Sequence, residues 1–214
     1  IRDRDVAFTI SNLTIPAKKN IDIPTANPFK CYLYPPAFDK EKLPIPFLLP
    51  PGGSNLMNIV SMMPKLKDEL RAIFNDYGLK YVFDTNSQEI KVMKEKKPGE
   101  IFLIPFHSIA DTLQRMIFYK AAIESNSKSA LVFEEPEAHS YPPFISKVTQ
   151  DIIQSDRNQF FITTHSPYVV NDFLELPSDE LAIYLVDFRN GETFVKRASD
   201  TEVQEMYEYG IDLF

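Results

Sequence analysis

Two polar clusters, each placed directly after a short apolar run, are the residues of this sequence best suited to chemistry. Glu134 and Glu135 follow residues 131–133, and His165 comes shortly after residues 160–163. Short apolar runs of this kind are typical of buried parallel strands, and ligands of an open α/β sheet bind at the carboxyl ends of its strands. We therefore expect a nucleotide site, in which the carboxylates serve a magnesium ion and a water and the imidazole serves a phosphate.

Each of these residues also has a purely structural interpretation. An acidic loop ended by Pro136 explains Glu134 and Glu135, and a histidine bonded to a loop carbonyl explains His165. Burying a carboxylate is costly unless a cation or hydrogen bonds compensate, so two acids after a strand favour a metal or a proton-transfer role. The continuation Glu-Glu-Pro-Glu-Ala-His over residues 134–139 favours the functional interpretation further.

The residues around these clusters are expected to alternate between strands and helices over 100–187. Residues 101–105 are strand-like, and Ser108 would cap the next helix, with Asp111 at the third helical position. An apolar stripe over residues 144–153 predicts a second helix. Alternation of this kind is typical of βαβ units with a parallel sheet.

Further elements are expected on both sides of this region. Apolar residues at helical spacing predict a helix over 66–77 that stops at Gly78. Ser166 is expected to cap a helix that begins at Pro167. Residues 31–34 belong to a proline-rich stretch and are expected only at a sheet edge or in a loop. Two hairpins are predicted, with strands at 79–83 and 89–93 and at 181–187 and 193–196.

The composition is that of an ordinary globular chain. The 214 residues are 44% hydrophobic and 25% charged, enough for one large domain or two small ones. The net charge of −7 gives no general attraction to nucleic acid, which leaves only a local basic patch for such binding. Cys31 is the one cysteine, which excludes an internal disulfide and fits a reducing, cytoplasmic environment. No apolar run approaches the roughly 20 residues that cross a bilayer, so we expect no membrane partner.

One motif is missing from the sequence. No Gly-x-x-x-x-Gly-Lys-Ser/Thr phosphate loop occurs, and the pair Gly52-Gly53 is followed by Ser54 and Asn55 without the lysine. The chain also lacks an initiator methionine. We therefore expect the natural polypeptide to start upstream of Ile1.

Taken together, these motifs resemble the C-terminal half of an ABC-type ATPase head of the RecF-like and SMC-like branch. The resemblance is greatest to bacterial AAA-domain ATPases related to the overcoming-lysogenization-defect proteins. In that family one strand ends in Asp-Glu-Pro-Glu, which residues 134–137 match, and the next ends in Thr-His-Ser-Pro, which residues 164–167 match. The resemblance covers roughly residues 99–175.

The resemblance implies the α/β fold of P-loop NTPases, with a parallel sheet and without the N-terminal phosphate-loop lobe. Residues 1–99 would then be an irregular lead-in or insert that contains a helix and a hairpin. Residues 100–214 would be the C-terminal ATPase lobe, which carries the Walker B-like and switch-histidine motifs.

The resemblance also implies roles for four residues and a set of partners. Glu134 would hold Mg²⁺ through water, Glu135 would polarise the attacking water, and His165 would sense the γ-phosphate of ATP. Ser108 corresponds to the signature serine and would contact a phosphate, with its capping role left open. The implied partners are a second copy, bound through the ATPase head, and a nuclease or toxin effector in phage defence or DNA repair.

Two departures from the family pattern leave alternatives open. Glu134 stands where aspartate is usual, and Ala110 replaces the glycine that lets backbone amides approach a phosphate closely. A scaffold or nucleotide-sensing module without turnover fits these departures. A metal-dependent hydrolase that uses Glu134, Glu135 and His139 is a third hypothesis, and it requires three ligands to converge within about 2.0–2.6 Å of one ion.

Overall fold

The computed structural model describes residues 27–35, 45–84, 86–87, 89–177 and 179–209, and every statement below concerns these residues. The strands are β1 (Phe29–Tyr32), β2 (Lys80–Asp84), β3 (Glu89–Lys97), β4 (Glu100–Pro105), β5 (Ala130–Glu134), β6 (Gln159–Thr163), β7 (Tyr184–Arg189) and β8 (Glu192–Arg197). The helices are α1 (Leu56–Met62), α2 (Pro64–Asp76), α3 (Asp111–Ser125), α4 (Pro142–Ile153), α5 (Pro167–Phe173) and α6 (Asp200–Tyr209), with a 3₁₀ turn η1 (Phe106–Ser108).

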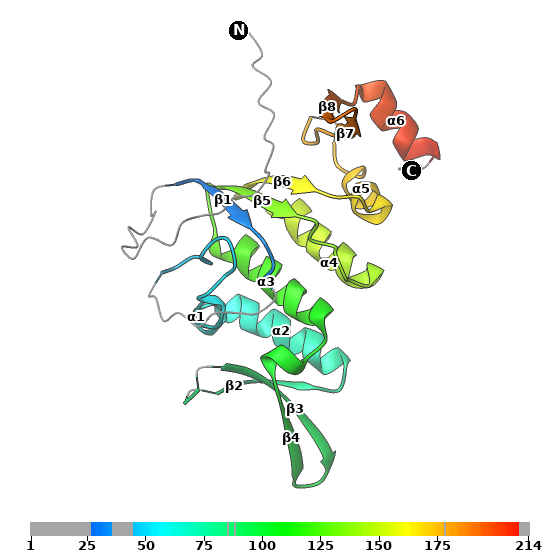
Figure 1. Cartoon of the computed structure of the whole chain (residues 1–214). Helices are drawn as coiled ribbons and strands as arrows, with labels where there is room; N and C mark the ends of the chain where they lie inside the picture. Colours follow the sequence, from blue (N-terminus) through cyan, green and yellow to red (C-terminus); the bar gives the residue numbers. More distant parts are fainter. Residues whose placement is uncertain (1–26, 36–44, 85, 88, 178, 210–214) are drawn as a thin grey trace.

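A three-stranded parallel sheet in the order β1-β5-β6 carries the two polar clusters (Figure 1). Val132 at its centre lies in register with Cys31 on one side and Phe161 on the other. The parallel α/β fold predicted from the sequence is confirmed, and so is the position of β1 at a sheet edge. Because β5 and β6 run in the same direction and in register, their carboxyl ends meet at one edge of the sheet.

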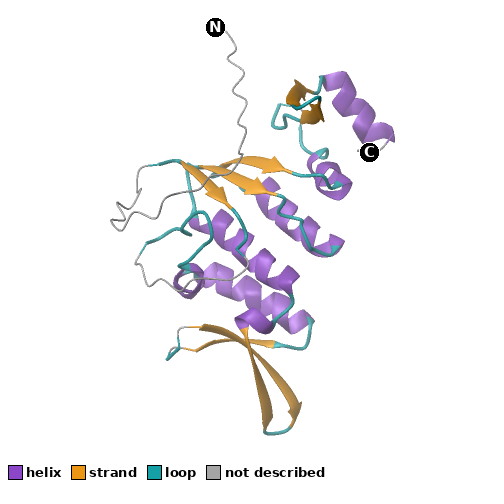
Figure 2. Cartoon of the chain, viewed as in Figure 1, coloured by secondary structure: helices purple, strands orange, loops and turns teal. Residues whose placement is uncertain are grey.

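Helices α1 to α4 lie on one side of this sheet, whereas α6 lies beside the C-terminal hairpin of β7 and β8 (Figure 2). The middle of α3 is buried nearly all the way round, as expected of a helix that packs between a sheet and further helices. Aromatic rings link it to the sheet: the centroid of Tyr119 lies 5.1 Å from that of Phe133, and Phe118 lies 6.1 Å from Tyr32. This core fixes the backbone immediately before the acidic cluster, since Phe133 is fully buried.

A second, antiparallel sheet in the order β2-β3-β4 lies beyond α2 (Figure 1). The hairpin and the helix stop at Gly78, which has φ of +64°, are confirmed. The expectation that residues 101–105 join the parallel layout is wrong. After a turn at Gly99, with φ of +86°, β4 folds back on β3 and pairs with it antiparallel. An apolar run predicts a strand but does not say which sheet it enters.

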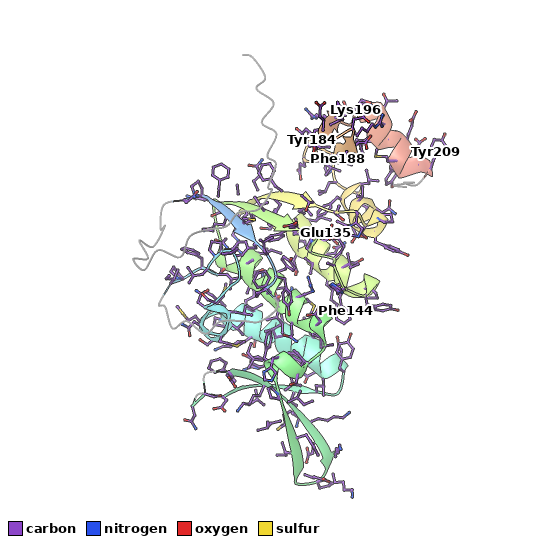
Figure 3. The ribbon with its side chains drawn as sticks, viewed as in Figure 1. Glu135, Phe144, Tyr184, Phe188, Lys196 and Tyr209 are labelled. Carbon is purple, nitrogen blue, oxygen red and sulfur yellow. The ribbon has the colours of Figure 1, made fainter. Side chains whose placement is uncertain are left out.

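The predicted C-terminal hairpin is also confirmed, and it forms a separate two-stranded sheet of β7 and β8. Asn190 and Gly191 turn it with φ of +55° and +85°, the positive values that tight hairpin turns require. Several large apolar side chains of this hairpin are exposed, among them Tyr184 and Phe188 (Figure 3). Within the described part of the chain, no helix is both long and apolar enough to cross a membrane.

Candidate functional site

The acidic cluster begins where β5 ends. Glu134 is the last residue of β5, is exposed, and lies in register with Thr163 at the end of β6. The backbone N–H of Glu135 donates to the carbonyl oxygen of Thr163 at 2.9 Å, so the first residue after β5 stays tied to β6. Glu135 has φ of +40°, in the left-handed region that non-glycine residues rarely adopt. The chain therefore turns sharply at the residue expected to act on water.

This turn brings Glu135 to the histidine of the neighbouring strand. Its Oε1 atom lies 3.0 Å from Nδ1 of His165, within hydrogen-bonding distance. Both side chains are about half exposed or more, at 48% for Glu135 and 65% for His165, so a ligand has access to both. Figure 3 shows Glu135 just past the end of β5. The sequence-based expectation that these two residues share one edge of the sheet is therefore met by the geometry.

A second contact joins the same two loops, between two residues that were not among the predicted site residues. The hydroxyl of Thr164 donates to Oε1 of Glu137 at 2.5 Å. Glu137 is only 7% exposed. It belongs to the acidic motif in the sequence, but nothing in residue type or spacing distinguishes a buried motif acid from an exposed one.

Ser108 is not the helix cap predicted from the sequence. It is the last residue of η1, α3 begins at Asp111, and the residue in the capping position is Ala110, without a side-chain capping bond. Asp111 is thus the first helical residue and not the third. The prediction failed because the 3₁₀ turn uses the residues that sequence pattern alone would assign to the first helical turn.

The start of α3 nevertheless lies beside the acidic turn. The hydroxyl of Thr112 donates to the carbonyl oxygen of His139 at 3.2 Å, which ties the first turn of α3 to the loop after Glu135. Ser108 itself is exposed, three residues before α3. The candidate phosphate-contacting residue is thus connected with the site through the helix that follows it. Ser166, by contrast, does occupy the predicted capping position before Pro167, although its side chain makes no capping bond.

The acids fit a magnesium ion better than they fit a metal centre made of protein ligands alone. Mg²⁺ is usually held by one or two carboxylates together with waters and substrate phosphates, and Glu134 at the exposed end of β5 suits that arrangement. In the described ranges no group of three or more His, Cys, Asp or Glu side chains gathers as a metal site. The metal-dependent hydrolase hypothesis therefore lacks its required ligand set of Glu134, Glu135 and His139.

Cys31 lies on β1, one strand away from the acids, and is not suited to nucleophilic catalysis. Burial raises the pKa of its thiol, and the charge of Glu134 raises it further. A raised pKa keeps the thiol protonated, whereas the thiolate is the nucleophile. This agrees with the sequence, which placed no base next to Cys31.

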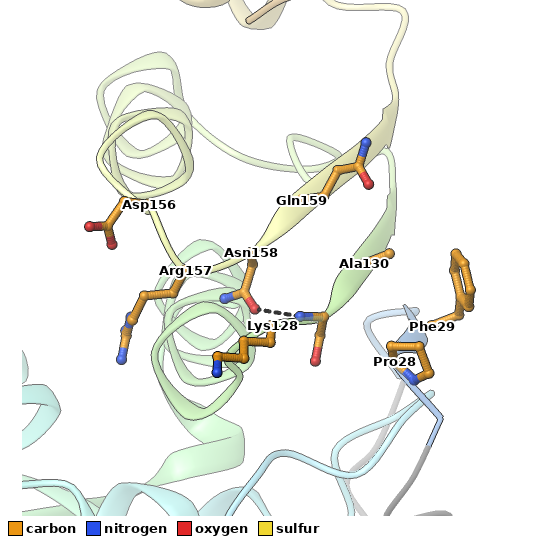
Figure 4. A pocket seen from close by; sticks show the side chains of 9 residues that line it. Pro28, Phe29, Lys128, Ala130, Asp156, Arg157, Asn158 and Gln159 are labelled. Atoms are coloured by element: carbon orange, nitrogen blue, oxygen red, sulfur yellow. Dashed lines mark hydrogen bonds between the residues drawn. The ribbon is translucent and has the colours of Figure 1, made fainter.

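Two cavities among the described residues lie away from this edge. One of about 490 Å³ opens at the amino ends of the three parallel strands, opposite Glu135 (Figure 4). There Asn158 accepts a hydrogen bond from the backbone N–H of Ser129 at 3.3 Å. Another, of about 450 Å³, lies between α2 and α4 and is lined in part by Lys120 and Asp151. The site at the carboxyl edge is itself exposed to solvent, since Glu134, Glu135 and His165 are all exposed.

A comparison with protein families matches the segment of the chain that carries the candidate site. Residues 100–170 match the model of the AAA ATPase domain. This segment runs from β4 to the first turns of α5 and contains both polar clusters. The resemblance to an ATPase that the motifs predicted is thereby confirmed for this part of the chain. A search of curated proteins found no match to the chain.

Three solved structures of SMC heads are similar at low sequence identity. One comes from work on ATP-driven dimerization and DNA stimulated activation of SMC ATPases, with 15% identity, a TM-score of 0.47, and coverage of 71% of this chain and 95% of that one. A Smc head with a coiled coil and joint from Pyrococcus yayanosii has 13% identity, a TM-score of 0.43, and coverage of 67% and 28%.

The third is a Smc head with an extended coiled coil from Pyrococcus furiosus, bound to the C-terminal domain of ScpA. It has 16% identity, a TM-score of 0.44, and coverage of 67% of this chain and 37% of that chain. This chain thus spans about a third of the length of the two Pyrococcus heads.

Proposed function

We propose that this chain is the C-terminal part of an ATPase head that binds and hydrolyses ATP. The observation that carries the proposal is the contact of 3.0 Å between Glu135 and His165, at the carboxyl edge of a parallel sheet and inside the segment that matches the AAA ATPase domain. A carboxylate and an imidazole at this edge suit a water and a phosphate, the two groups that ATP hydrolysis brings together.

Each residue of the site has a distinct task in this proposal. Glu135 accepts a hydrogen bond from the attacking water and orients it, and His165 donates to the γ-phosphate from its exposed ring. Glu134 holds Mg²⁺ through water, and that ion neutralises phosphate charge when it is bound. Ser108 contacts the phosphates of a nucleotide held mainly by a second head.

Partners and pathway are a further part of the proposal. A phosphate loop supplied by a segment outside these 214 residues would complete the nucleotide site. Two heads would then close on ATP and separate after hydrolysis, and a nuclease or toxin effector would respond to that cycle in phage defence or DNA repair. Support for this part comes from the resemblance of the motifs, since a fold by itself does not determine function.

A scaffold or nucleotide-sensing module without turnover is the second candidate. Two residues favour it. Ala110 stands at the start of α3, where a glycine would let backbone amides approach a phosphate, and Glu134 is one methylene longer than the usual aspartate. The paired Glu135 and His165 oppose it, because a scaffold has no need of either.

The deciding experiment measures ATP affinity and single-turnover hydrolysis in the complete protein and in its His165→Ala variant. The proposal expects hydrolysis in the complete protein and a loss of about a hundredfold in the variant, with binding kept. Binding without any hydrolysis in the complete protein would instead identify the sensing module.

A further inference from the structure

Glu137 is the one acid of the motif that has no task in the proposed function, and it is also the one that is buried. Its exposed fraction is 7%, whereas Glu134 and Glu135 in the same turn are exposed. A carboxylate is costly to bury unless its oxygens are hydrogen-bonded. The hydrogen-bond partner of Glu137 therefore indicates its role.

Its contact is with the loop that carries the histidine. The hydroxyl of Thr164 donates to Oε1 of Glu137 at 2.5 Å, within the range of an O–H···O hydrogen bond. The same hydroxyl oxygen accepts the backbone N–H of Ser166 at 3.0 Å. Thr164 therefore connects the turn after β5 with the backbone on both sides of His165.

The turn that contains Glu137 has a strained residue at each end. Glu135 and His139 both have left-handed backbones, with φ of +40° and +58°. Two backbone bonds close the turn, from Ala138 N–H to the Glu135 carbonyl at 3.0 Å and from Ser140 N–H to the Glu137 carbonyl at 2.9 Å. Left-handed conformations at non-glycine residues persist only where the surroundings hold them.

Groups in the protein interior do not hold Glu137 in place by hydrogen bonds to its carboxylate. Its second oxygen, Oε2, is buried without a hydrogen-bond partner among the described residues, and so is the hydroxyl of Tyr119. Thr164 is thus the only side chain in the described part of the chain that bonds the Glu137 carboxylate.

We propose that Glu137 and Thr164 are positioning residues, whose hydrogen bond holds Glu135 and His165 at their working separation. We call this hydrogen bond between Thr164 and Glu137 the clamp. Its effect on turnover rests on the proposed function, but the clamp itself is a property of the two loops. Neither residue needs to touch nucleotide, because Thr164 directly precedes His165 and Glu137 lies in the same turn as Glu135, two positions further on.

The first test replaces the hydroxyl of Thr164 in the complete protein. Thr164→Val keeps the shape and removes the donor, so kcat should fall by about tenfold to a hundredfold while KM for ATP stays nearly constant. Thr164→Ser keeps the donor and should restore most of kcat. Thr193→Val on the exposed strand β8 is the matched control and should leave both constants unchanged.

A second variant guards against a simple folding defect. Thr164→Val leaves a buried carboxylate without its partner, which can unfold the protein. Glu137→Gln keeps an acceptor oxygen for Thr164, and it should retain most of the turnover that Glu137→Ala loses. Equal losses in these two Glu137 variants would overturn the clamp.

The positioning role is separated from a merely structural one by combining Thr164→Val with His165→Ala. If Thr164 acts through His165, its removal costs no further turnover once the imidazole is gone. Losses that multiply in the double variant would show that Thr164 acts elsewhere and would contradict the proposal.

Amide hydrogen exchange tests the clamp without any ATP hydrolysis. Thr164→Val should speed the exchange of the Ala138 and Ser140 amides by about tenfold or more, because the turn loses its hydrogen bond from Thr164 to the buried Glu137 side chain. A complete protein that does not hydrolyse ATP would refute the proposed function, while faster exchange would still support the clamp. Unchanged exchange would refute the clamp whatever the turnover.

Discussion

The side chains of Glu135 and His165 lie 3.0 Å apart although thirty positions separate them in the sequence. Two parallel strands in register bring them together, because β5 and β6 end at the same edge of the sheet. The contact is direct, and both side chains are exposed to solvent. It is the basis of the first prediction.

Replacing Glu135 by glutamine in the complete protein keeps the shape and removes the charge. We expect turnover to fall by about a hundredfold or more, the usual scale for losing a general base, while ATP binding survives. The ATP-bound dimer should then accumulate. Glu134→Gln should differ by weakening magnesium-dependent binding itself, since it removes charge from the proposed ion site.

Both variants are measured by ATP affinity and single-turnover hydrolysis, with Glu192→Gln on β8 as the control for an exposed glutamate. A Glu135→Gln protein that hydrolyses ATP at the wild-type rate would show that Glu135 was assigned wrongly. If the sensing module is correct, neither substitution changes turnover, because there is none to lose.

The 214-residue chain by itself is expected to bind ATP weakly or not at all. Its sequence has no phosphate-loop lysine and no glycine-rich loop, the elements whose N–H groups and charge offset the desolvation of phosphates. Isothermal titration calorimetry should show no micromolar binding. Micromolar affinity for ATP would mean that the residues described here suffice for a nucleotide site.

Lys120 is predicted to stabilise the fold, and its replacement should be strongly destabilising. It is 7% exposed and pairs with Asp151 at 2.6 Å and with Glu69 at 2.9 Å. Lys120→Met leaves Asp151 without its cation and should lower the free energy of unfolding by about 3 kcal/mol. Lys65→Met, at a lysine that is 68% exposed, should cost less than about 1 kcal/mol. Urea unfolding measures both.

The same lysine predicts how stability changes at alkaline pH. Burial alone would lower the pKa of Lys120, but the paired acids outweigh burial and raise it above the ordinary value of 10.5. Its contribution is therefore complete below pH 10.5 and is lost as the pH rises through the raised pKa. Lys120→Met should show a smaller alkaline loss than the wild type. An identical loss of stability at alkaline pH in the two proteins would contradict this assignment.

Gly53 is predicted to tolerate no side chain. It has φ of +67°, and a Cβ built there would lie 2.8 Å from a ring carbon of Phe118 and 3.1 Å from a methyl of Leu48. Gly53→Ala should destabilise the fold by about 2–4 kcal/mol, from backbone strain and overpacking together.

Gly78 is the matched control for this substitution. Its φ is +64° but a Cβ there would have nothing within 4 Å, so Gly78→Ala should cost only the strain of about 1–2 kcal/mol. Urea midpoints of the two variants separate packing from strain. Equal costs at the two glycines would show that Phe118 and Leu48 move aside freely.

The sequence by itself determined the elements whose signals are local. Apolar runs located β5 and β6, the spacing of apolar residues located α2 and α4, and the Asn190-Gly191 turn located the last hairpin. Because parallel strands present their carboxyl ends at one edge, the meeting of Glu135 and His165 also followed from the order of the elements. The motif around these residues carried the ATPase resemblance.

Only the tertiary structure decided the features that depend on contacts between distant residues. The antiparallel pairing of β4 depends on its partner β3, and the late start of α3 depends on a 3₁₀ turn packed through the buried Phe106. Glu137 and Thr164 lie inside the two sequence motifs, but no role was predicted for either, because burial and a hydrogen bond across 27 positions leave no trace in residue type or spacing. The sequence thus determines which residues lie at the sheet edge, whereas packing between loops decides which of them face solvent and which hold the others in place.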